Sequence, residues 1–292
     1  MSRVVILGAT GMLGNNVYSV LQDKYDLVLT ARDKQKLTLL DGVHGGMDKH
    51  EVLEFDAEKV YEDFLVNKGY AENYLSRFLD QLGTFDYAIN AIGITNHYSV
   101  ESKDLMLFVN GVLPHIFARE WGSKLIHITT DCAFNGVTGA PYSEDSHKTP
   151  NDLYGLSKSI GEPTDCLTIR TSIIGKELEG ARGLLAWFLL QEGKEIRGFS
   201  NHFWNGITAE QFGKICDQIM QNRDLYPTTG IYHVFSDVVS KHQILLSFQK
   251  KFKLNCKIIE DPEPKLNRTL TTVKELNNKL RVPSFSAMVE DL

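Results

Sequence analysis

The chain opens with a short apolar run that leads directly into a glycine-rich turn. The run is RVVILG, and the turn, GATGMLG, carries glycines at positions 8, 11 and 14 before a helical stretch. Glycines here permit a tight turn and let backbone N–H groups at a helix N-terminus approach a pyrophosphate. The expected contacts are Gly8, Thr10, Gly11, Met12, Leu13 and Gly14. The spacing differs from the common G-x-G-x-x-G, so a turn that binds no ligand is the alternative.

Apolar runs alternate with helical stretches through the first half of the chain. The runs are RVVILG, DLVLTA, EVLEF, FDYAINAIG and KLIHITT. Runs that are apolar throughout and separated by helices indicate a parallel sheet covered on both faces. We therefore expect a doubly wound α/β fold of the Rossmann type. Helices are expected over 56–83, with a break at Gly69, and over 99–122, with a kink or division at Pro114.

The last third of the chain has shorter and more broken elements. We expect residues 1–170 to form a dinucleotide-binding domain and residues 171–292 to form mainly a smaller substrate-binding lobe, with some segments returning to the sheet. The ligand site should then lie between the lobes, at the carboxyl ends of the strands.

Composition excludes several classes of protein. A net charge of −6 over 292 residues does not provide the basic face of a nucleic-acid-binding protein. The longest strongly apolar run, 184–190, is too short to span a bilayer, and no export signal is visible, so we expect a cytoplasmic protein without membrane contact. Neither the cysteines nor the histidines have zinc-ligand spacing, and we expect no metal.

Two residues that follow strands bear on cofactor choice. An acidic residue after the second strand is typical of NAD sites, but DLVLTARDK places Arg32 there. Because a guanidinium can bind a 2′-phosphate, we expect NADPH, with NADH as the alternative and a solvated Arg32 as the alternative role. Asp56, after the third strand, is expected either to accept from the adenine amino group or to cap a helix.

Tyr154 and Lys158 are four residues apart in YGLSK, so both lie on one face of the expected helix. A nearby ammonium stabilises a phenolate, and we expect it to lower the pKa of Tyr154 and make it a usable proton donor. The hydroxyl of Thr130, at the end of the preceding strand, could bind the same substrate oxygen. The pattern Y-x-x-x-K is common and usually structural, so it carries weight only together with the glycine-rich turn.

Six motifs occur together in one order: GATGMLG, INAIGIT, VNGVLP, TTDCAFNG, YGLSK and IRTSIIG. In this order they resemble the extended short-chain dehydrogenase/reductases, and more narrowly the dTDP-4-dehydrorhamnose reductase branch. The resemblance implies that Thr130, Tyr154 and Lys158 are catalytic, and that Asn110 supports the lysine or is a structural helix residue. It also implies cofactor contacts at Ala91, Ile92, Gly93, Tyr154, Lys158 and Thr171.

One departure from the family pattern concerns the substrate. The family usually reads T-D-Y-V-F-D-G where this chain has TDCAFNG, so Cys132 replaces a tyrosine in a segment that faces the sugar in relatives. Related 4,6-dehydratases follow the threonine with Asp-Glu, whereas Asp131 precedes Cys132 here, which argues against dehydration. The expected substrate contacts are Thr130, Asp131, Cys132, Trp204, Asn205 and Arg268, and Trp204 is equally compatible with a core position.

The resemblance implies NADPH-dependent reduction of a nucleoside-diphosphate 4-keto-6-deoxyhexose for surface polysaccharide synthesis. Two alternatives remain open at this point: an NAD-dependent sugar-nucleotide epimerase, and a catalytically silent NADP-binding regulatory subunit on the same scaffold. Dimers are common in the superfamily, so a homodimer is one expected state.

Overall fold

The computed structural model describes residues 1–95 and 103–292. Its centre is a seven-stranded sheet in which every pair of neighbouring strands is parallel, in the order β11-β6-β5-β4-β1-β2-β3. The strands are β1 (Arg3–Leu7), β2 (Asp26–Ala31), β3 (Glu51–Glu54), β4 (Tyr87–Asn90), β5 (Leu125–Thr130), β6 (Leu167–Thr171) and β11 (Gly230–His233). The first six follow the order of doubly wound dinucleotide-binding folds.

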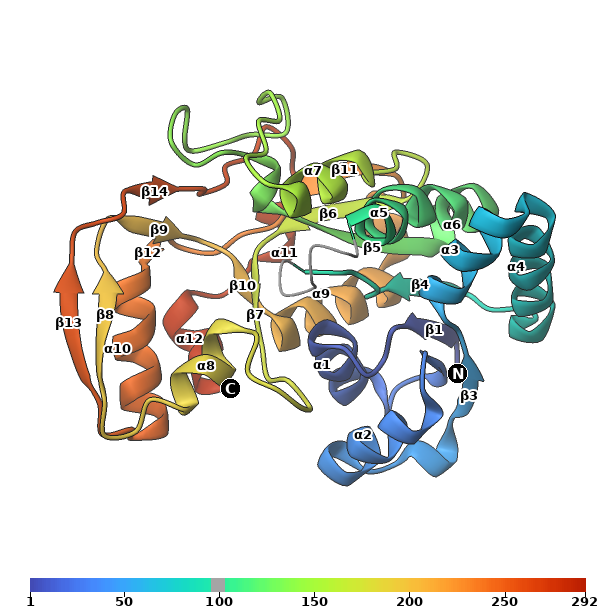
Figure 1. Ribbon diagram of the computed structural model, residues 1–292, viewed down its shortest axis with the longest axis horizontal. Helices are drawn as coiled ribbons and strands as arrows, with labels where there is room; N and C mark the ends of the chain where they lie inside the picture. The colour runs from blue at the N-terminus through green and yellow to red at the C-terminus, as the bar shows by residue number, and fades with distance from the viewer. Residues whose placement is uncertain (96–102) are drawn as a thin grey trace.

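Helices cover both faces of this sheet (Figure 1). They are α1 (Met12–Leu21), α2 (Leu37–His44), α3 (Ala57–Val66), α4 (Lys68–Leu82), α5 (Lys103–Leu107), α6 (Leu113–Trp121), α7 (Leu153–Ile160) and α9 (Ala209–Gln221). Short 3-10 turns occupy residues 34–36, 47–49, 122–124, 131–133 and 223–225, and a π-helical turn occupies 108–112.

Two hydrophobic cores lie on opposite faces of the sheet because side chains alternate along each strand. In β1, Val4 and Ile6 belong to the core that contains α1 and α9, whereas Val5 and Leu7 belong to the core beneath α3 to α6. The strands are therefore buried on both sides, which explains their continuous apolar runs.

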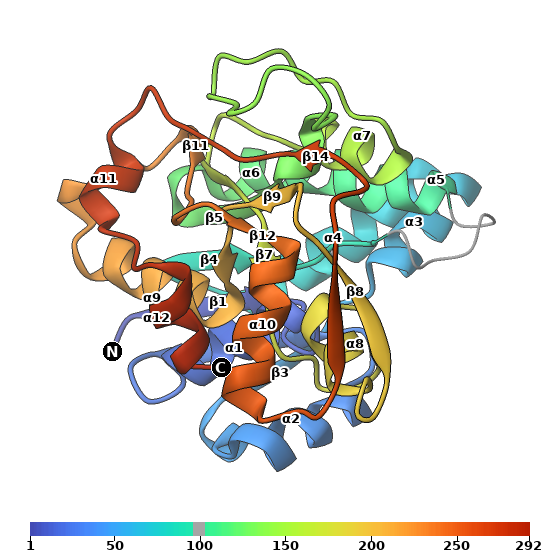
Figure 2. The same cartoon turned by 90° about the vertical axis from the view of Figure 1, so that its left-hand side faces the viewer.

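The second, smaller lobe continues the first of these cores. Its elements are β7 (Ile173–Ile174), α8 (Leu184–Leu189), β8 (Glu195–Phe199), β9 (His202–Trp204), β10 (Ile207–Thr208), β12 (Val239–Ser240), α10 (Lys241–Phe252), β13 (Lys257–Asp261), β14 (Leu266–Asn267), α11 (Leu276–Leu280) and α12 (Phe285–Glu290). Figure 2 turns this lobe toward the viewer, with α10 in front. One segment from this part of the chain, β11, returns to pair with β6 at the edge of the main sheet.

The helix boundaries differ in detail from those expected. The break expected at Gly69 lies at Asn67, whose side chain accepts from the Gly69 amide at 2.9 Å and caps α4. The helix expected over 99–122 is divided as expected near Pro114, because the π-helical turn precedes α6. Its first residues, 99–102, lie outside the described residues.

Candidate active site

The glycine-rich turn follows β1 and begins α1. Gly8 has a φ of +75°, which favours glycine, and a Cβ on Gly14 would lie 2.2 Å from the Gly8 carbonyl oxygen. Gly14 therefore permits close packing of helix on strand. Gly11 is the N-cap of α1 and supplies no side-chain cap, so the first amides of the helix remain available for an anion.

A cleft runs from this turn along the carboxyl ends of β2, β3 and β4. It is lined by Gly8, Thr10, Gly11, Arg32, Phe55, Asp56, Ala57, Glu58, Ala91, Ile92, Gly93, Ile94, Leu105 and Val109. Most of the residues predicted to contact a cofactor thus lie together. Six predicted contacts do not line the cleft: Met12, Leu13, Gly14, Tyr154, Lys158 and Thr171. Leu13 is buried in the core, and Thr171 is buried at the end of β6.

Arg32 and Asp56 are already engaged inside the cleft. The Arg32 guanidinium forms an ion pair with Glu58 at 2.9 Å, and both side chains are about half exposed. Asp56 accepts from the Glu58 amide at 2.9 Å and caps α3, which is the second of its two expected roles. Glu58 is a cleft residue that the sequence reading missed, because only the fold brings α3 next to the end of β2.

Thr130 is the last residue of β5, the strand that precedes the predicted catalytic helix α7. Its hydroxyl oxygen accepts from the Cys132 amide at 3.2 Å, and the same hydroxyl lies 3.2 Å from Asp131 Oδ1. Asp131 is buried, and burial raises its pKa in spite of the nearby cations Arg268 and Lys241. Burial also raises the pKa of the Cys132 thiol, to about 12, so this thiol is neutral near pH 7.

Tyr154 lies in the first turn of α7, which packs tightly against the segment after Thr130. A Cβ on Gly155 would lie 2.2 Å from the Cys132 carbonyl oxygen, so glycine is needed for this approach. Burial raises the pKa of Tyr154, and a side-chain hydrogen bond with Thr130 opposes that shift. The lowered Tyr154 pKa expected from the sequence is therefore wrong for the protein without ligands, because burial dominates and Cys132 and Asp131 raise the pKa further.

Lys158 lies one turn further along α7 and is buried. Its ammonium donates to the Ile128 carbonyl oxygen at 2.8 Å, which directs it along β5. Burial lowers its pKa to about 8, while Glu162 raises it. A Cβ on Gly93 would lie 4.0 Å from the Lys158 Nζ, so the ammonium lies close to a residue that lines the cleft.

Asn110 occupies the π-helical turn, a distortion that is frequent at functional sites. Its amide accepts from the Ile94 amide at 2.9 Å and donates to the Ile94 carbonyl oxygen at 2.8 Å and to the Ser157 hydroxyl at 3.0 Å. Asn110 thus joins the cleft-lining loop after β4 to α7. This geometry favours the structural one of its two expected roles.

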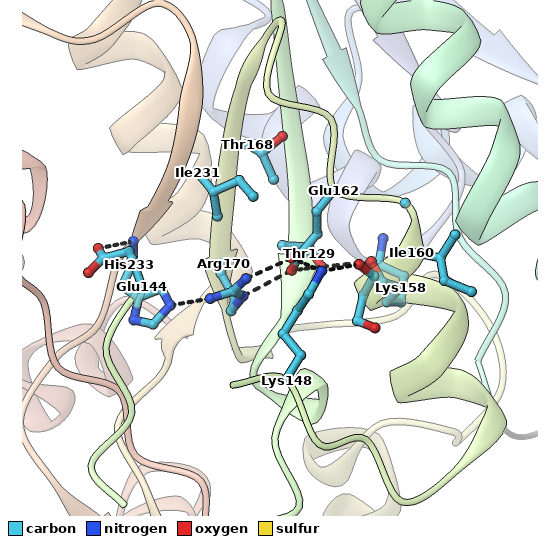
Figure 3. A network of polar contacts seen from close by, with 12 residues as sticks. Thr129, Glu144, Lys148, Lys158, Ile160, Glu162, Thr168, Arg170, Ile231 and His233 are labelled. Atoms are coloured by element: carbon cyan, nitrogen blue, oxygen red, sulfur yellow. Dashed lines mark hydrogen bonds and ion pairs between the residues drawn. The ribbon is translucent and has the colours of Figure 1, made fainter. Parts of the chain in front are cut away.

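A buried ion-pair network supports the end of α7 (Figure 3). Both carboxylate oxygens of Glu162 accept from Arg170, at 2.9 and 2.6 Å, and Lys148 and the Thr129 hydroxyl each donate to the carboxylate at 3.1 Å. The Thr129 hydroxyl also lies 3.3 Å from the Lys158 carbonyl oxygen. Glu162 therefore fixes α7 to β5 and β6 and adds negative charge near the lysine.

The network continues through His233 to the C-terminal segment. Arg170 lies 2.6 Å from His233 Nε2, and His233 Nδ1 lies 2.7 Å from the Thr271 carbonyl oxygen. The Nδ1–H tautomer satisfies both contacts, because Nε2 then accepts from the guanidinium. Burial and Arg170 lower the His233 pKa to about 4.

The residues expected to contact substrate lie in different environments. Arg268 donates to the Phe134 carbonyl oxygen and to Asn151 Oδ1, both at 3.0 Å, and lies 3.6 Å from Cys132 Sγ. Trp204 is buried against Phe285, in keeping with its alternative core role.

Asn205 is also buried, and it exchanges two hydrogen bonds with the Leu270 backbone. Those bonds tie the C-terminal segment to the lobe. The sequence analysis missed Lys241. Its ammonium is close enough to Asp131 and Cys132 for both groups to raise its pKa. No local sequence signal marks that lysine.

Within the described residues, no group of three His, Cys, Asp or Glu side chains could hold a metal ion. No described helix combines the length and apolarity needed to cross a bilayer.

A family model described as the RmlD substrate binding domain matches residues 73–291. The chain belongs to this family. The RmlD assignment agrees with the resemblance read from the six motifs and makes the protein a member of a sugar-nucleotide oxidoreductase family.

Two curated relatives are similar over part of the chain. The spore coat polysaccharide biosynthesis protein SpsK of Bacillus subtilis (strain 168) is 25% identical over 214 residues, 70% of either chain. A dTDP-4-dehydrorhamnose reductase of Burkholderia thailandensis is 28% identical over 170 residues, which cover 52% of this chain and 56% of that protein.

Solved structures share the fold over nearly the whole chain. A dTDP-4-dehydrorhamnose reductase from Bacillus anthracis, solved with NADP, gives a TM-score of 0.69 at 17% identity and covers 99% of this chain and 98% of that chain. The enzyme WbmG of Bordetella bronchiseptica, solved with NAD and UDP, gives a TM-score of 0.70 at 15% identity. The match covers 98% of this chain and 91% of that chain. The predicted doubly wound fold is confirmed.

Proposed function

We propose that this protein reduces the 4-keto group of a nucleoside-diphosphate 4-keto-6-deoxyhexose with NADPH, yielding the 4-hydroxy sugar for surface polysaccharide synthesis. One observation carries the proposal: α7 packs on the end of β5, with Tyr154 in a side-chain hydrogen bond with Thr130 and the Lys158 ammonium bonded to the Ile128 carbonyl oxygen. The named reductases among the relatives support it. SpsK, a polysaccharide biosynthesis protein, supports the pathway.

The cleft suits a dinucleotide. The Gly11 N-cap presents free amides for a pyrophosphate, and the Ala91 to Gly93 segment lines the path toward Lys158. Arg32 is placed for a 2′-phosphate, although it must first give up its pairing with Glu58. NADH is the alternative cofactor, since Glu58 is a carboxylate beside the expected ribose position.

Bound NADPH would supply the hydride. Tyr154 would donate its proton to the C4 oxygen, and its raised pKa keeps it protonated and ready to donate. Thr130 would orient the same oxygen through its hydroxyl. Lys158 would hold the nicotinamide ribose hydroxyls and stabilise the phenolate that forms.

The substrate would lie between α7 and the smaller lobe. Arg268 is the proposed diphosphate ligand, and Asp131 and Cys132 would face the sugar. Trp204 and Asn205 would then act indirectly, by holding the lobe and the C-terminal segment in place.

The test is an absorbance assay near 340 nm. The purified protein is incubated with NADPH or NADH and with dTDP- and UDP-linked 4-keto-6-deoxy sugars generated in situ by a dehydratase. Loss of absorbance that requires the keto-sugar is expected, faster with NADPH. No loss with any sugar, while NADPH still binds, would reject the reductase in favour of an epimerase or a silent binding subunit.

A further inference from the structure

Two cations follow directly on the outer strands of the three-stranded sheet β12-β9-β14. Both outer strands pair with Phe203 of β9, β12 through Ser240 and β14 through Asn267. Lys241 comes directly after Ser240, as the first residue of α10, and Arg268 comes directly after Asn267. The Lys241 Nζ lies 6.0 Å from the Trp204 ring centroid, and both cations act electrostatically on His202.

The end of β14 packs on the segment that follows Thr130. A Cβ on Gly136 would lie 2.7 Å from Arg268 Cγ and 2.7 Å from Leu266 Cδ1, so the loop touches this end of the strand directly. Arg268 also reaches Cys132, at 3.6 Å. The two cations therefore border the expected sugar position.

Among the described residues, neither cation forms an ion pair with a carboxylate. The described acceptors of Arg268 are neutral, namely the Phe134 carbonyl oxygen, Asn151 Oδ1 and Cys132 Sγ. The Lys241 side chain has no hydrogen bond and no ion pair with any described residue, and it lies over the Trp204 ring. On a protein of net charge −6, these two cations thus lie near each other without contact to an anion from the described part of the chain.

The surrounding groups do not remove this imbalance. Asp131 acts on Lys241 electrostatically but forms no ion pair with it. The Asp131 carboxylate is instead hydrogen-bonded with Thr130, Ser172 and the Cys132 thiol. His202 is held neutral near pH 7, with its pKa lowered to about 4 by burial and by both cations. Burial likewise lowers the pKa of Lys241, as expected for an ammonium withdrawn from water without a close partner.

We propose that Lys241 and Arg268 together form an anion subsite that binds an oxyanion group of the substrate beside the sugar. An ammonium and a guanidinium near each other suit either the diphosphate of the nucleotide or a carboxylate on the sugar. The inference rests on the proposed function, which identifies the ligand as a sugar nucleotide. It adds Lys241 to the residues that recognise this ligand.

Calorimetric titration of the NADP⁺-saturated protein tests the subsite without turnover. The probes are dTDP, UDP, UDP-glucose and UDP-glucuronate, of which the last adds a sugar carboxylate. The variants are Lys241→Met, Lys241→Arg and, as a matched control, Lys250→Met, which removes an exposed lysine from the same helix. Thermal melts of each variant check that it is folded.

Lys241→Met should weaken probe binding by about 10- to 100-fold, as expected for loss of a charged hydrogen bond. Lys241→Arg should restore most of the loss, and Lys250→Met should change nothing. An equal loss for every probe assigns the diphosphate, whereas a loss confined to UDP-glucuronate assigns the carboxylate. Unchanged dissociation constants in folded Lys241→Met, or no binding of any probe by the unsubstituted protein, would overturn the subsite.

The outcome is separable from that of the proposed function. Lys241-dependent binding without reduction of any keto-sugar would reject the reductase and keep the subsite. Reduction of keto-sugars with a KM that Lys241→Met leaves unchanged would keep the reductase and reject the subsite.

Discussion

Glu162, two residues after the end of α7, and Arg170 in β6 form a buried ion pair through two hydrogen bonds. The nitrogen to oxygen distances are 2.9 and 2.6 Å. Arginine suits this role because its planar fork matches both carboxylate oxygens. The pair holds the helix that carries Tyr154 and Lys158 against the end of β5. Substitution of Glu162 should therefore change both the free energy of unfolding and the rate of reduction.

Glu162→Gln should lower the free energy of unfolding by about 3 to 5 kcal/mol, because Arg170 would keep a buried charge without its partner. Urea unfolding measures the change. The matched control is Glu72→Gln, which breaks the exposed Lys68–Glu72 pair and should cost about 1 kcal/mol or less. Equal effects of the two substitutions would show that the buried pair is not a main support of α7.

The rate of reduction should fall as the pH rises through about 8, since burial lowers the Lys158 pKa to about that value and the neutral amine no longer stabilises a phenolate. Glu162 raises this pKa, so Glu162→Gln should move the alkaline limb of kcat/KM to lower pH. A profile of kcat/KM against pH for both proteins, with Glu72→Gln as control, measures the shift. An alkaline limb at the same pH in both proteins would show that Glu162 does not raise the Lys158 pKa.

Stability should decline between about pH 6.5 and pH 4 because of His233. Its folded pKa, about 4, lies below the ordinary value of 6.5, so the unfolded chain binds this proton more tightly. The stabilisation is complete above pH 6.5 and is lost as the pH falls toward 4, by up to about 3 kcal/mol. Urea unfolding at several pH values measures it.

His233→Gln should reduce this slope, whereas His147→Gln, at an exposed position, should not. His127 and His202, whose pKa values are also lowered, should maintain part of the slope in both variants. Parallel curves for His233→Gln and the unsubstituted protein would contradict the assignment.

Cofactor preference should depend on the Arg32–Glu58 pair. Arg32→Ala should weaken NADPH binding about tenfold and leave NADH nearly unchanged, because only the former offers a 2′-phosphate. Glu58→Gln should tighten NADPH by up to about fivefold, since half-exposed ion pairs are worth about 1 kcal/mol or less. Fluorescence titration of both cofactors decides this, and equal losses for NADPH and NADH in Arg32→Ala would exclude the phosphate contact.

Tyr154→Phe should reduce kcat by about 10²- to 10⁴-fold, the usual contribution of a positioned proton donor. Binding of NADPH should remain within about twofold. Tyr70→Phe removes a hydroxyl from an exposed tyrosine and should leave kcat unchanged. Full turnover by the Tyr154 variant would remove the proposed mechanism.

The parts of this fold that local patterns determine were readable from the sequence. The strand RVVILG and the glycines after it predict the phosphate turn because φ, close packing and burial are all local there. The break between α3 and α4 was placed two residues late, because Asn67 caps through its side chain and Gly69 only supplies the amide.

The misses arise from contacts between distant segments. Glu58, which was not expected in the cleft, meets Arg32 across 26 positions. The Tyr154 pKa differs from the expectation because its largest determinant is burial, a property of the whole fold. Lys241 becomes visible only once the ladders of a three-stranded sheet are known.

The return of β11 to the main sheet bears on how the chain folds during synthesis. Its parallel ladder with β6 joins residues 167–170 to residues 230–233, so the sheet has an unprotected edge at β6 until the later segment emerges from the ribosome. Exposed edges are templates for aggregation. A fragment ending at residue 170 should therefore be prone to self-association, and the two parts of the chain depend on each other in assembly.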